Sequence, residues 1–90
     1  MDITWDPVKA HSNVEKHGVA FSDAEPVLFD PYGITVEDES VDAEQRFVTI
    51  GLDALGRILV VVYTYRDDNI RLISARQAIR QERKDYETGI

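Results

Sequence analysis

The side chains best suited to chemistry in this sequence are arginines, and they gather in the second half of the chain. Residues 46–90 hold seven Arg and one Lys against six acids, whereas residues 1–45 hold two Lys against eleven acids. A guanidinium presents a planar fork of donors that binds phosphate in a bidentate way. The second half is therefore the candidate region for binding a phosphate, with Arg66, Arg71 and Arg76 as its leading residues.

Arg66 and Arg71 flank a predicted turn. If residues 68 and 69 form the loop, Arg66 lies directly opposite Arg71 in a hairpin, where like charges repel each other. Neutralisation by Asp67 or Asp68 would make this a surface ion cluster, whereas an anion between the two guanidinium groups would make it a phosphate clamp. The sequence leaves both interpretations open.

Arg76 stands at the predicted junction of the last strand and the last helix. The bases that follow it, Arg80, Arg83 and Lys84, interleave with acids, which is typical of a solvated helix face with ion pairs. Its place at the junction makes Arg76 the best candidate for chemistry among these four.

A second basic group lies in the first predicted helix. Lys9, Asn13 and Lys16 are spaced i, i+4 and i+7, so they share one helix face. That face is either solvated or placed near a phosphate. His17 follows in the last turn, where an imidazole can bond the last carbonyl groups and interact with the helix dipole. Alternatively it transfers protons, because His is the side chain that ordinarily titrates near neutrality.

Composition excludes several classes of site. The chain has no Cys, so disulfides, thiolate nucleophiles and Cys-based metal sites are excluded. His11 and His17 are six apart, a poor fit to helical metal-ligand spacing. We therefore expect neither a metal nor a cofactor. The net charge of −7 argues against non-specific binding to nucleic acid.

Length and hydropathy predict one soluble domain over residues 1–90, located in the cytoplasm. The N-terminus lacks the basic start and apolar stretch of a signal peptide. The longest apolar run, at residues 58–63, is far shorter than a membrane span.

Two helices are predicted in the first third of the chain, after a short extended segment at residues 3–5. Asp6 and Pro7 form an N-cap and N1 pair, and Gly18 is a typical residue just past a helix end. Ser22 and Glu25 match the S-x-x-E capping box, which predicts a short second helix ending near residue 29.

The pattern then alternates, which predicts four strands at residues 34–38, 45–52, 57–66 and 70–75. Residues 57–66 are apolar on both faces, so this strand should lie inside the sheet. A last helix ends at Gly89. The expected order is β-α-α-β-β-β-β-α, an α+β domain with an antiparallel sheet and helices packed on it.

Two further features complete the expected domain. The aromatic residues Trp5, Phe21, Phe29 and Phe47 are predicted to lie in the core, because a domain this small needs its large apolar side chains inside. The acidic stretch at residues 37–44 is predicted to be a solvated, mobile loop, which could fold back over the basic cleft.

The arrangement of these residues resembles the BrnT toxins from Trp5 to Tyr86. The similarity rests on W-D at residues 5–6, Lys9, Asn13, K-H-G at residues 16–18, Val19, Phe21, V-L-F-D at residues 27–30, Glu44, Arg46, Gly51, T-Y-R at residues 64–66, R-L-I-S-A-R at residues 71–76, Glu82 and Tyr86. W-D and K-H-G together with I-S-A-R form a fairly specific combination.

The resemblance implies a RelE-like ribonuclease fold, RNA cleavage without metal and growth arrest. It also implies neutralisation by a BrnA-type antitoxin, in a hetero-oligomer that contacts DNA only through the ribbon-helix-helix domain of that antitoxin. The chain is more acidic than expected of an RNA-cutting toxin.

Cleavage of this kind needs the 2′-OH deprotonated, the phosphate charge stabilised and the 5′-oxygen protonated. The catalytic candidates are Arg66, Arg71, Arg76 and His17, with a Tyr as the alternative to His17 for moving protons. The RNA-binding candidates are Lys9, Lys16 and Arg46.

Two other functions fit the sequence. One is a catalytically weak interaction module that binds its antitoxin and modulates DNA binding. The other is a metal-dependent nuclease, which is disfavoured because the acids cluster only on a predicted loop.

Overall fold

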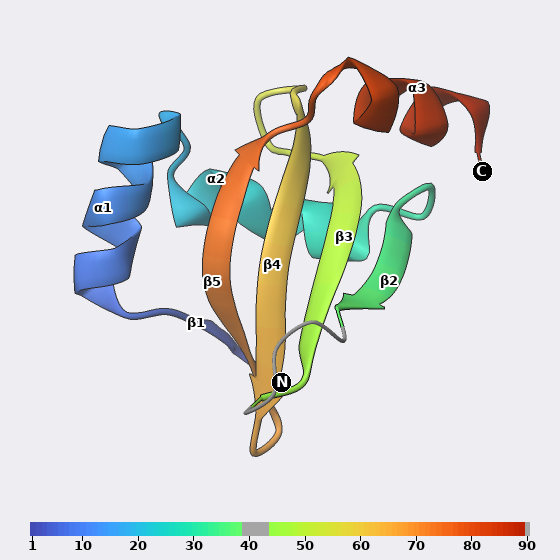
Figure 1. The fold of residues 1–90 in the computed structure, drawn as a ribbon. Coiled ribbons are helices and arrows are strands. Elements are labelled where there is room, and N and C mark those ends of the chain that lie inside the picture. Colours follow the sequence, from blue (N-terminus) through green and yellow to red (C-terminus); the bar gives the residue numbers. More distant parts are fainter. Residues whose placement is uncertain (39–43, 90) are drawn as a thin grey trace.

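The computed structural model describes residues 1–38 and 44–89. Its elements follow the predicted order (Figure 1): β1 (Ile3–Thr4), α1 (Pro7–His17), α2 (Phe21–Ala24), the 3-10 helix η1 (Glu25–Phe29), β2 (Ile34–Asp38), β3 (Arg46–Leu52), β4 (Ile58–Arg66), β5 (Asn69–Gln77) and α3 (Arg80–Thr88). An α+β fold is therefore confirmed. The acidic segment predicted at residues 37–44 lies largely outside the described residues.

The sheet has the strand order β1-β5-β4-β3-β2. Strands β2 to β5 form an antiparallel meander with β4 in the middle, as its two apolar faces predicted. The prediction of an antiparallel sheet is wrong for β1, because Ile3 and Thr4 pair in parallel with Ile70 and Arg71. The sheet is mixed because short turns join β3 to β4 and β4 to β5, which makes these pairs antiparallel hairpins, whereas helices separate β1 from the rest of the sheet and remove this constraint.

Both boundaries of α1 were predicted correctly, and the start of α2 was not. The Asp6 carboxylate accepts the Val8 N–H at 2.8 Å, and Gly18 adopts φ 67° at the end of α1. α2 begins one residue before Ser22, so Ser22 is inside the first turn and does not cap it. Its N-cap is Ala20, which makes no side-chain cap bond.

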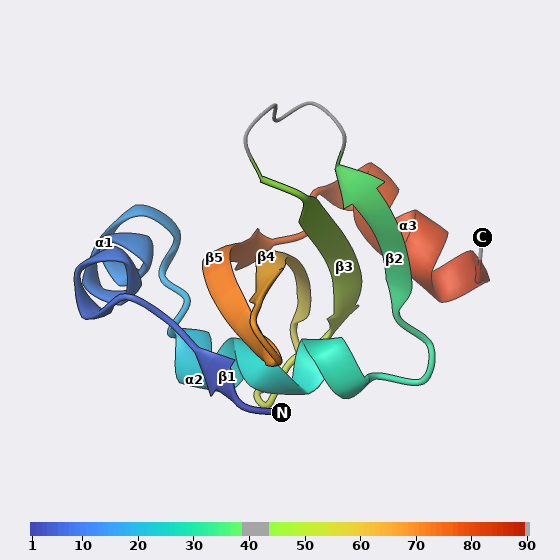
Figure 2. The same ribbon diagram turned by 90° about the horizontal axis from the view of Figure 1, so that it is seen from below.

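The core lies between the sheet and the layer formed by α2 and η1, which pass behind the strands in Figure 1 and below them in Figure 2. Its buried side chains are Val19, Phe21, Ala24, Val27, Leu59, Val61, Tyr63, Ile70, Leu72 and Ala75. Trp5 packs edge-on against Phe21, with ring centroids 5.9 Å apart. Phe29 is 71% exposed, so its predicted core position is wrong. It ends η1 and its side chain is turned to solvent.

A single buried amide attaches α1 to the sheet. Asn13 is only 5% exposed. Its Nδ2 donates to the carbonyl of Ala75 at 2.8 Å and to that of Val19 at 2.9 Å, and its Oδ1 accepts the Ala75 N–H at 3.1 Å. The pairing of β1 with β5 extends only to Arg71. Further along this edge of β5, Asn13 takes the place of a neighbouring strand and forms hydrogen bonds with the N–H and carbonyl groups of Ala75.

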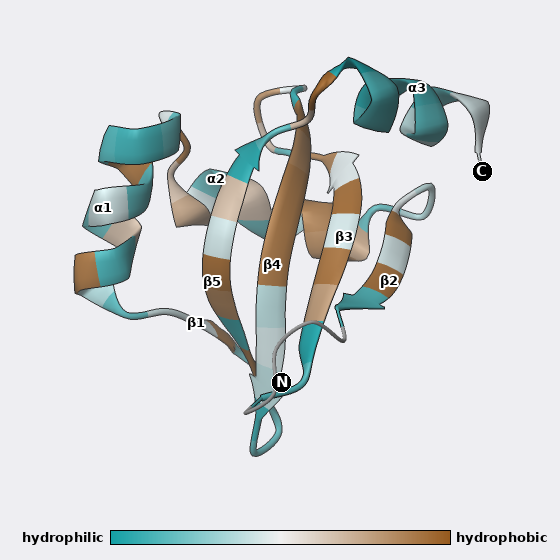
Figure 3. Ribbon diagram, viewed as in Figure 1, coloured by the Kyte–Doolittle hydropathy of each residue, from teal (hydrophilic) through white to brown (hydrophobic). Residues whose placement is uncertain are grey.

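Polar contacts attach α3. None of its residues is fully buried, and Figure 3 shows that α3, at the top of the view, is coloured hydrophilic, whereas the centre of the sheet is apolar. No helix in the described part of the chain has the length and apolar character needed to cross a membrane.

Candidate functional site

The four candidate arginines of the strands share one face of the sheet. Phe47 and Tyr63 pair across β3 and β4 and pack into the core, so alternate positions point the other way. That opposite surface, which we call the arginine face, carries Arg46, Arg66, Arg71 and Arg76. The structure thus brings together the residues predicted to bind phosphate.

The pairing of the strands differs from the predicted hairpin. Arg66 pairs with Asn69, and Arg71 pairs with Thr64. The loop is Asp67 and Asp68, one residue earlier than predicted. Asp67 adopts φ 55°, which Asp tolerates better than most residues. Arg66 and Arg71 are therefore diagonal neighbours, and the predicted direct opposition is wrong.

A transverse row of polar side chains crosses the arginine face. Asp38 of β2 pairs with Arg46 of β3, and Thr64 of β4 pairs with Arg71 of β5. Arg71 also pairs with Thr4 of β1. The row extends across the whole sheet, and two of its members are arginines.

Two of the arginines already contact carboxylates. Arg66 lies 3.2 Å from Glu44. Both terminal nitrogens of Arg76 donate hydrogen bonds to the carboxylate of Glu82 in α3, at 2.8 and 2.9 Å. The bonds from Arg76, with a further one from the Ile79 N–H, hold the pKa of Glu82 below its ordinary value, and the same pair raises the pKa of Arg76.

The other two arginines have donors left over. Within residues 1–38 and 44–89, the Arg71 guanidinium forms no hydrogen bond or ion pair. The Nε of Arg46 is buried and has no hydrogen-bond partner among the described atoms. Because a buried donor without an acceptor is costly, Arg46 and Arg71 are the arginines best prepared to accept an added anion.

The lysines and the histidine of α1 form a second basic group. They line a cavity of about 220 Å³ between α1 and β5, which we call the α1–β5 pocket. Its lining residues are Lys9, Ser12, Asn13, Lys16, His17, Ile73 and Ser74. Asn13 is bonded to β5, so the helix face that carries Lys9 and Lys16 lies next to the strand, although both lysine side chains are exposed.

A β-bulge shapes the wall of this pocket. Val62 pairs with Ser74 while Tyr63 pairs with Leu72, so Ile73 is an extra residue in β5. Ser74, opposite Val62, belongs to the arginine face as well as to the pocket. The two basic groups therefore meet at Ser74.

The tyrosines are poorly placed to move protons on the arginine face. The Tyr86 hydroxyl donates to Asp30 at 2.5 Å, and this bond together with burial raises the pKa of Tyr86 to about 12. Burial acts to raise the pKa of Asp30, but hydrogen bonds from Tyr86 and two backbone N–H groups outweigh it and lower the pKa. Tyr63 is in the core, and Tyr65 shares its side of the sheet.

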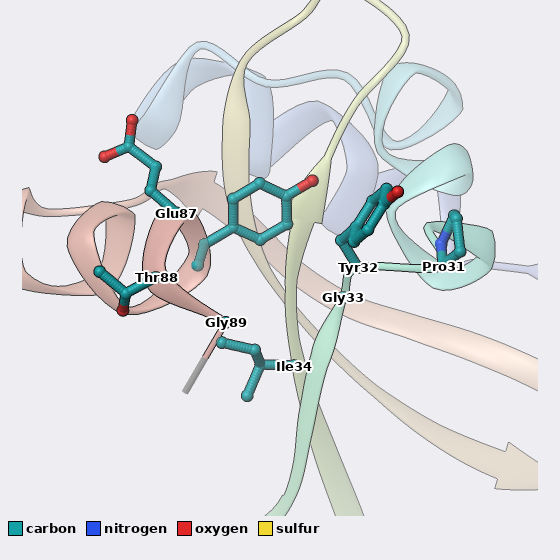
Figure 4. Close-up of a pocket in the computed structure, with 8 residues that line it drawn as sticks. Pro31, Tyr32, Gly33, Ile34, Glu87, Thr88 and Gly89 are labelled. Carbon is teal, nitrogen blue, oxygen red and sulfur yellow. The ribbon is translucent and has the colours of Figure 1, made fainter.

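A larger cavity, of about 520 Å³, lies between the end of α3 and the start of β2 (Figure 4). Tyr32, Ile34 and Tyr86 line it, together with other residues at the end of α3. It carries no candidate arginine, lysine or histidine, and its one charged lining residue is Glu87. The chemistry expected from the sequence is therefore not located there.

Sequence reasoning missed the residues that hold the basic groups in place. Glu82 matches the spacing of a capping box in α3, but nothing in its position predicts a bond to Arg76. The structural role of Asn13 depends on a contact with Ala75, 62 residues away. Across residues 1–38 and 44–89, no three His, Asp or Glu side chains are grouped to hold a metal ion.

Comparisons with known proteins agree with this architecture. The family model described as the ribonuclease toxin BrnT of type II toxin–antitoxin systems matches residues 5–82. The crystal structure of the Brucella abortus ribonuclease toxin BrnT is similar, with a TM-score of 0.69 and 28% sequence identity. The match covers 89% of this chain and 99% of the Brucella chain. No curated protein matches the sequence.

Proposed function

Because the chain belongs to the BrnT family of ribonuclease toxins of type II toxin–antitoxin systems, we propose that it cleaves RNA without a metal ion on its arginine face. The observation that carries this proposal is the convergence of four arginines from three adjacent strands on one surface. Fixed guanidinium groups stabilise the charge that develops on a phosphate during cleavage. We also propose a RelE-like fold, with residues 1–90 as a single toxin domain.

Arg71 is the proposed main phosphate ligand, because its guanidinium has no partner among the described residues. Arg66 and Arg76 also stabilise the phosphate, each beside a carboxylate that fixes its position. Arg46, in the same transverse row as Arg71, binds the adjoining RNA backbone. Lys9 and Lys16 bind RNA from α1.

His17 is the proposed proton-transfer group, since the Tyr86 hydroxyl donates its hydrogen bond to Asp30 and Tyr63 is buried. It lines the α1–β5 pocket with Ser74, whose strand also carries Arg71 and Arg76. RNA entering this corner of the sheet would meet both a histidine and the guanidinium groups.

An antitoxin is expected from the type II family. We propose that it is a BrnA-type protein with a ribbon-helix-helix domain, that the two form a hetero-oligomer in the cytoplasm, and that the toxin contacts DNA only through this partner. Expression of the chain alone should arrest bacterial growth, and co-expression of the antitoxin should restore it. Harmless expression of folded protein would favour a weak interaction module instead.

The proposed chemistry is tested with purified protein and RNA in the presence of a chelator. We expect cleavage at the same rate with and without the chelator. Loss of cleavage on chelation, with recovery on adding magnesium, would overturn the metal-independent mechanism while leaving the family assignment intact.

A further inference from the structure

The α1–β5 pocket differs from the rest of this acidic protein in its charge. Two lysines, a histidine and two serine hydroxyls line it, and none of the described lining residues is acidic. On α1, the one described ion pair joins His11 and Glu15, neither of which lines the pocket. The net charge of −7 of the whole chain does not cancel such a local field, because exposed charges beyond about 10 Å are screened.

The fold holds this basic group in a fixed place. Lys9 and Lys16 lie one turn before and one turn after Asn13 on the same helix face. Since Asn13 is bonded to both backbone groups of Ala75, the two lysines stand on either side of a fixed point on β5. The backbone of α1 at the two lysines is therefore held beside the strand by a buried attachment, whereas the lysine side chains are exposed.

The pocket also adjoins the arginine face. Ser74 lies two positions before Arg76 in β5, and a strand advances about 3.3 Å per residue, so their Cα atoms are about 7 Å apart. An RNA strand bound on the arginine face can therefore pass over Ser74 and bring a neighbouring phosphate to the lysines. We infer that the lysines of the α1–β5 pocket form a second anion subsite, which binds a backbone phosphate flanking the scissile one in single-stranded RNA, while His17 of the same pocket serves the neighbouring scissile phosphate.

This inference rests on the proposed function, and the chemistry of the pocket specifies the substrate class. A cavity of about 220 Å³ has room for one phosphate and part of its nucleotide, not for a duplex. Its lining holds no Phe, Tyr or Trp side chain on which a base could stack, and the one ring among its lining residues is the imidazole of His17. Binding here should consequently depend on salt and little on sequence.

The test is the binding of a labelled, unstructured 2′-O-methyl RNA oligonucleotide, which cannot be cleaved, at several salt concentrations. Each lost phosphate contact reduces the slope of log K against log salt by about 0.7 for a single strand. Lys9→Ala and Lys16→Ala should each reduce it by about 0.7, and the double variant by about 1.4. Lys84→Ala, an exposed lysine of α3, removes the same charge and should leave the slope unchanged.

Cleavage kinetics give a second readout. The double variant should raise KM for a long substrate by a larger factor than it lowers kcat, because the flanking phosphate is held in both the ground state and the transition state. Melting temperatures show whether each variant folds. Because Lys9 and Lys16 are both exposed, we expect the variants to melt close to the wild-type temperature.

Three results would overturn the inference: wild-type slopes in the double variant, an equal loss in Lys84→Ala, or wild-type protein that binds the oligonucleotide without salt dependence. Unchanged RNA binding with weakened antitoxin binding would assign the pocket to the partner protein and also overturn it. Salt-dependent binding without any cleavage would contradict the proposed function and leave this subsite standing.

Discussion

The arginine face and the α1–β5 pocket carry the same sign of charge in different surroundings. Arg66 and Arg76 of the arginine face contact Glu44 and Glu82, whereas the lysines of the pocket form no ion pair with any described residue. All four arginines lie on strands of the sheet and two of them are also held by carboxylates, whereas the lysines have long exposed stems on a helix. This difference indicates separate tasks: a rigid array suits a transition state, and flexible charges suit the capture of a substrate.

The comparison also explains how an acidic chain can act on RNA. Its acids are not spread evenly over the two basic groups. Within the described residues, a carboxylate accompanies two of the four arginines and neither of the two lysines. The local field at each group, and not the net charge, determines whether a phosphate binds there.

The largest expected effect is the loss of cleavage in Arg71→Ala. Removing one electrostatic donor to the developing charge lowers the rate by about 10²–10³. Stability should change by only about 0–1 kcal/mol, since Arg71 has no described partner to leave unpaired. Single-turnover cleavage and thermal melting measure the two quantities, with Lys84→Ala as the charge-matched control.

Arg66→Ala and Arg76→Ala should also lose cleavage, but Arg76→Ala should be less stable because it leaves Glu82 without its partner. If all three arginine variants cleave normally, the arginine face is not the active site, and the α1–β5 pocket becomes the next place to look.

A large effect on stability is expected from Asn13→Ala. It removes the partner of both backbone groups of Ala75, and unsatisfied buried groups cost about 1–3 kcal/mol each. Partial access of water should reduce the total loss to about 2–4 kcal/mol. Urea unfolding measures this loss, with the neighbouring Ser12→Ala as the control. Equal stabilities of the two variants would show that Asn13 does not attach α1 to β5.

A smaller effect is expected from Glu82→Gln, which weakens the contact between α3 and Arg76. Gln keeps an oxygen that can accept the Ile79 N–H, so the loss of the partly exposed ion pair is the main effect and should cost about 1 kcal/mol. Glu87→Gln, on the same helix without a described ion pair, should change stability by less than about 0.5 kcal/mol. Faster cleavage by Glu82→Gln would contradict the positioning role and show that Glu82 competes with the phosphate.

The smallest effect concerns alkaline pH. The folded state keeps the Tyr86 proton until about pH 12, whereas an ordinary tyrosine loses it near pH 10. The stabilisation is therefore complete below pH 10 and is lost as the pH rises from about 10 to about 12. Unfolding free energies of wild type should fall more steeply over this window than those of Tyr86→Phe. Parallel curves would mean that the bond to Asp30 does not perturb the phenol.

Local signals in the sequence predicted most of the fold. Asp6 with Pro7 defined the start of α1, Gly18 its end, and the two apolar faces of residues 57–66 placed β4 in the middle. These features depend on a residue and its immediate neighbours, so they are readable without tertiary contacts. The parallel pairing of β1 and the exposure of Phe29 depend on how distant segments meet, and the sequence did not predict them.

The sequence predicted which residues form the candidate site, but not which residues they pair with or contact. Alternation placed the arginines on strands, yet a loop one residue earlier than expected changed the partner of Arg71 from Arg66 to Thr64. Register depends on turn conformation, here on Asp67 with a positive φ, and sequence patterns specify this poorly. Ser74 lies next to both basic groups because of the β-bulge at Ile73, which no pattern in the sequence predicted.

The central claim is that RNA binds on the arginine face, and an NMR titration with the non-cleavable oligonucleotide tests it most directly. We predict that the largest shifts in backbone amide signals occur at Arg46, Thr64, Arg71 and Ser74, with small shifts at Glu37 and Tyr65 on the other face of the same strands. Shifts concentrated at Glu37 and Tyr65, with Arg71 and Ser74 unmoved, would contradict the account.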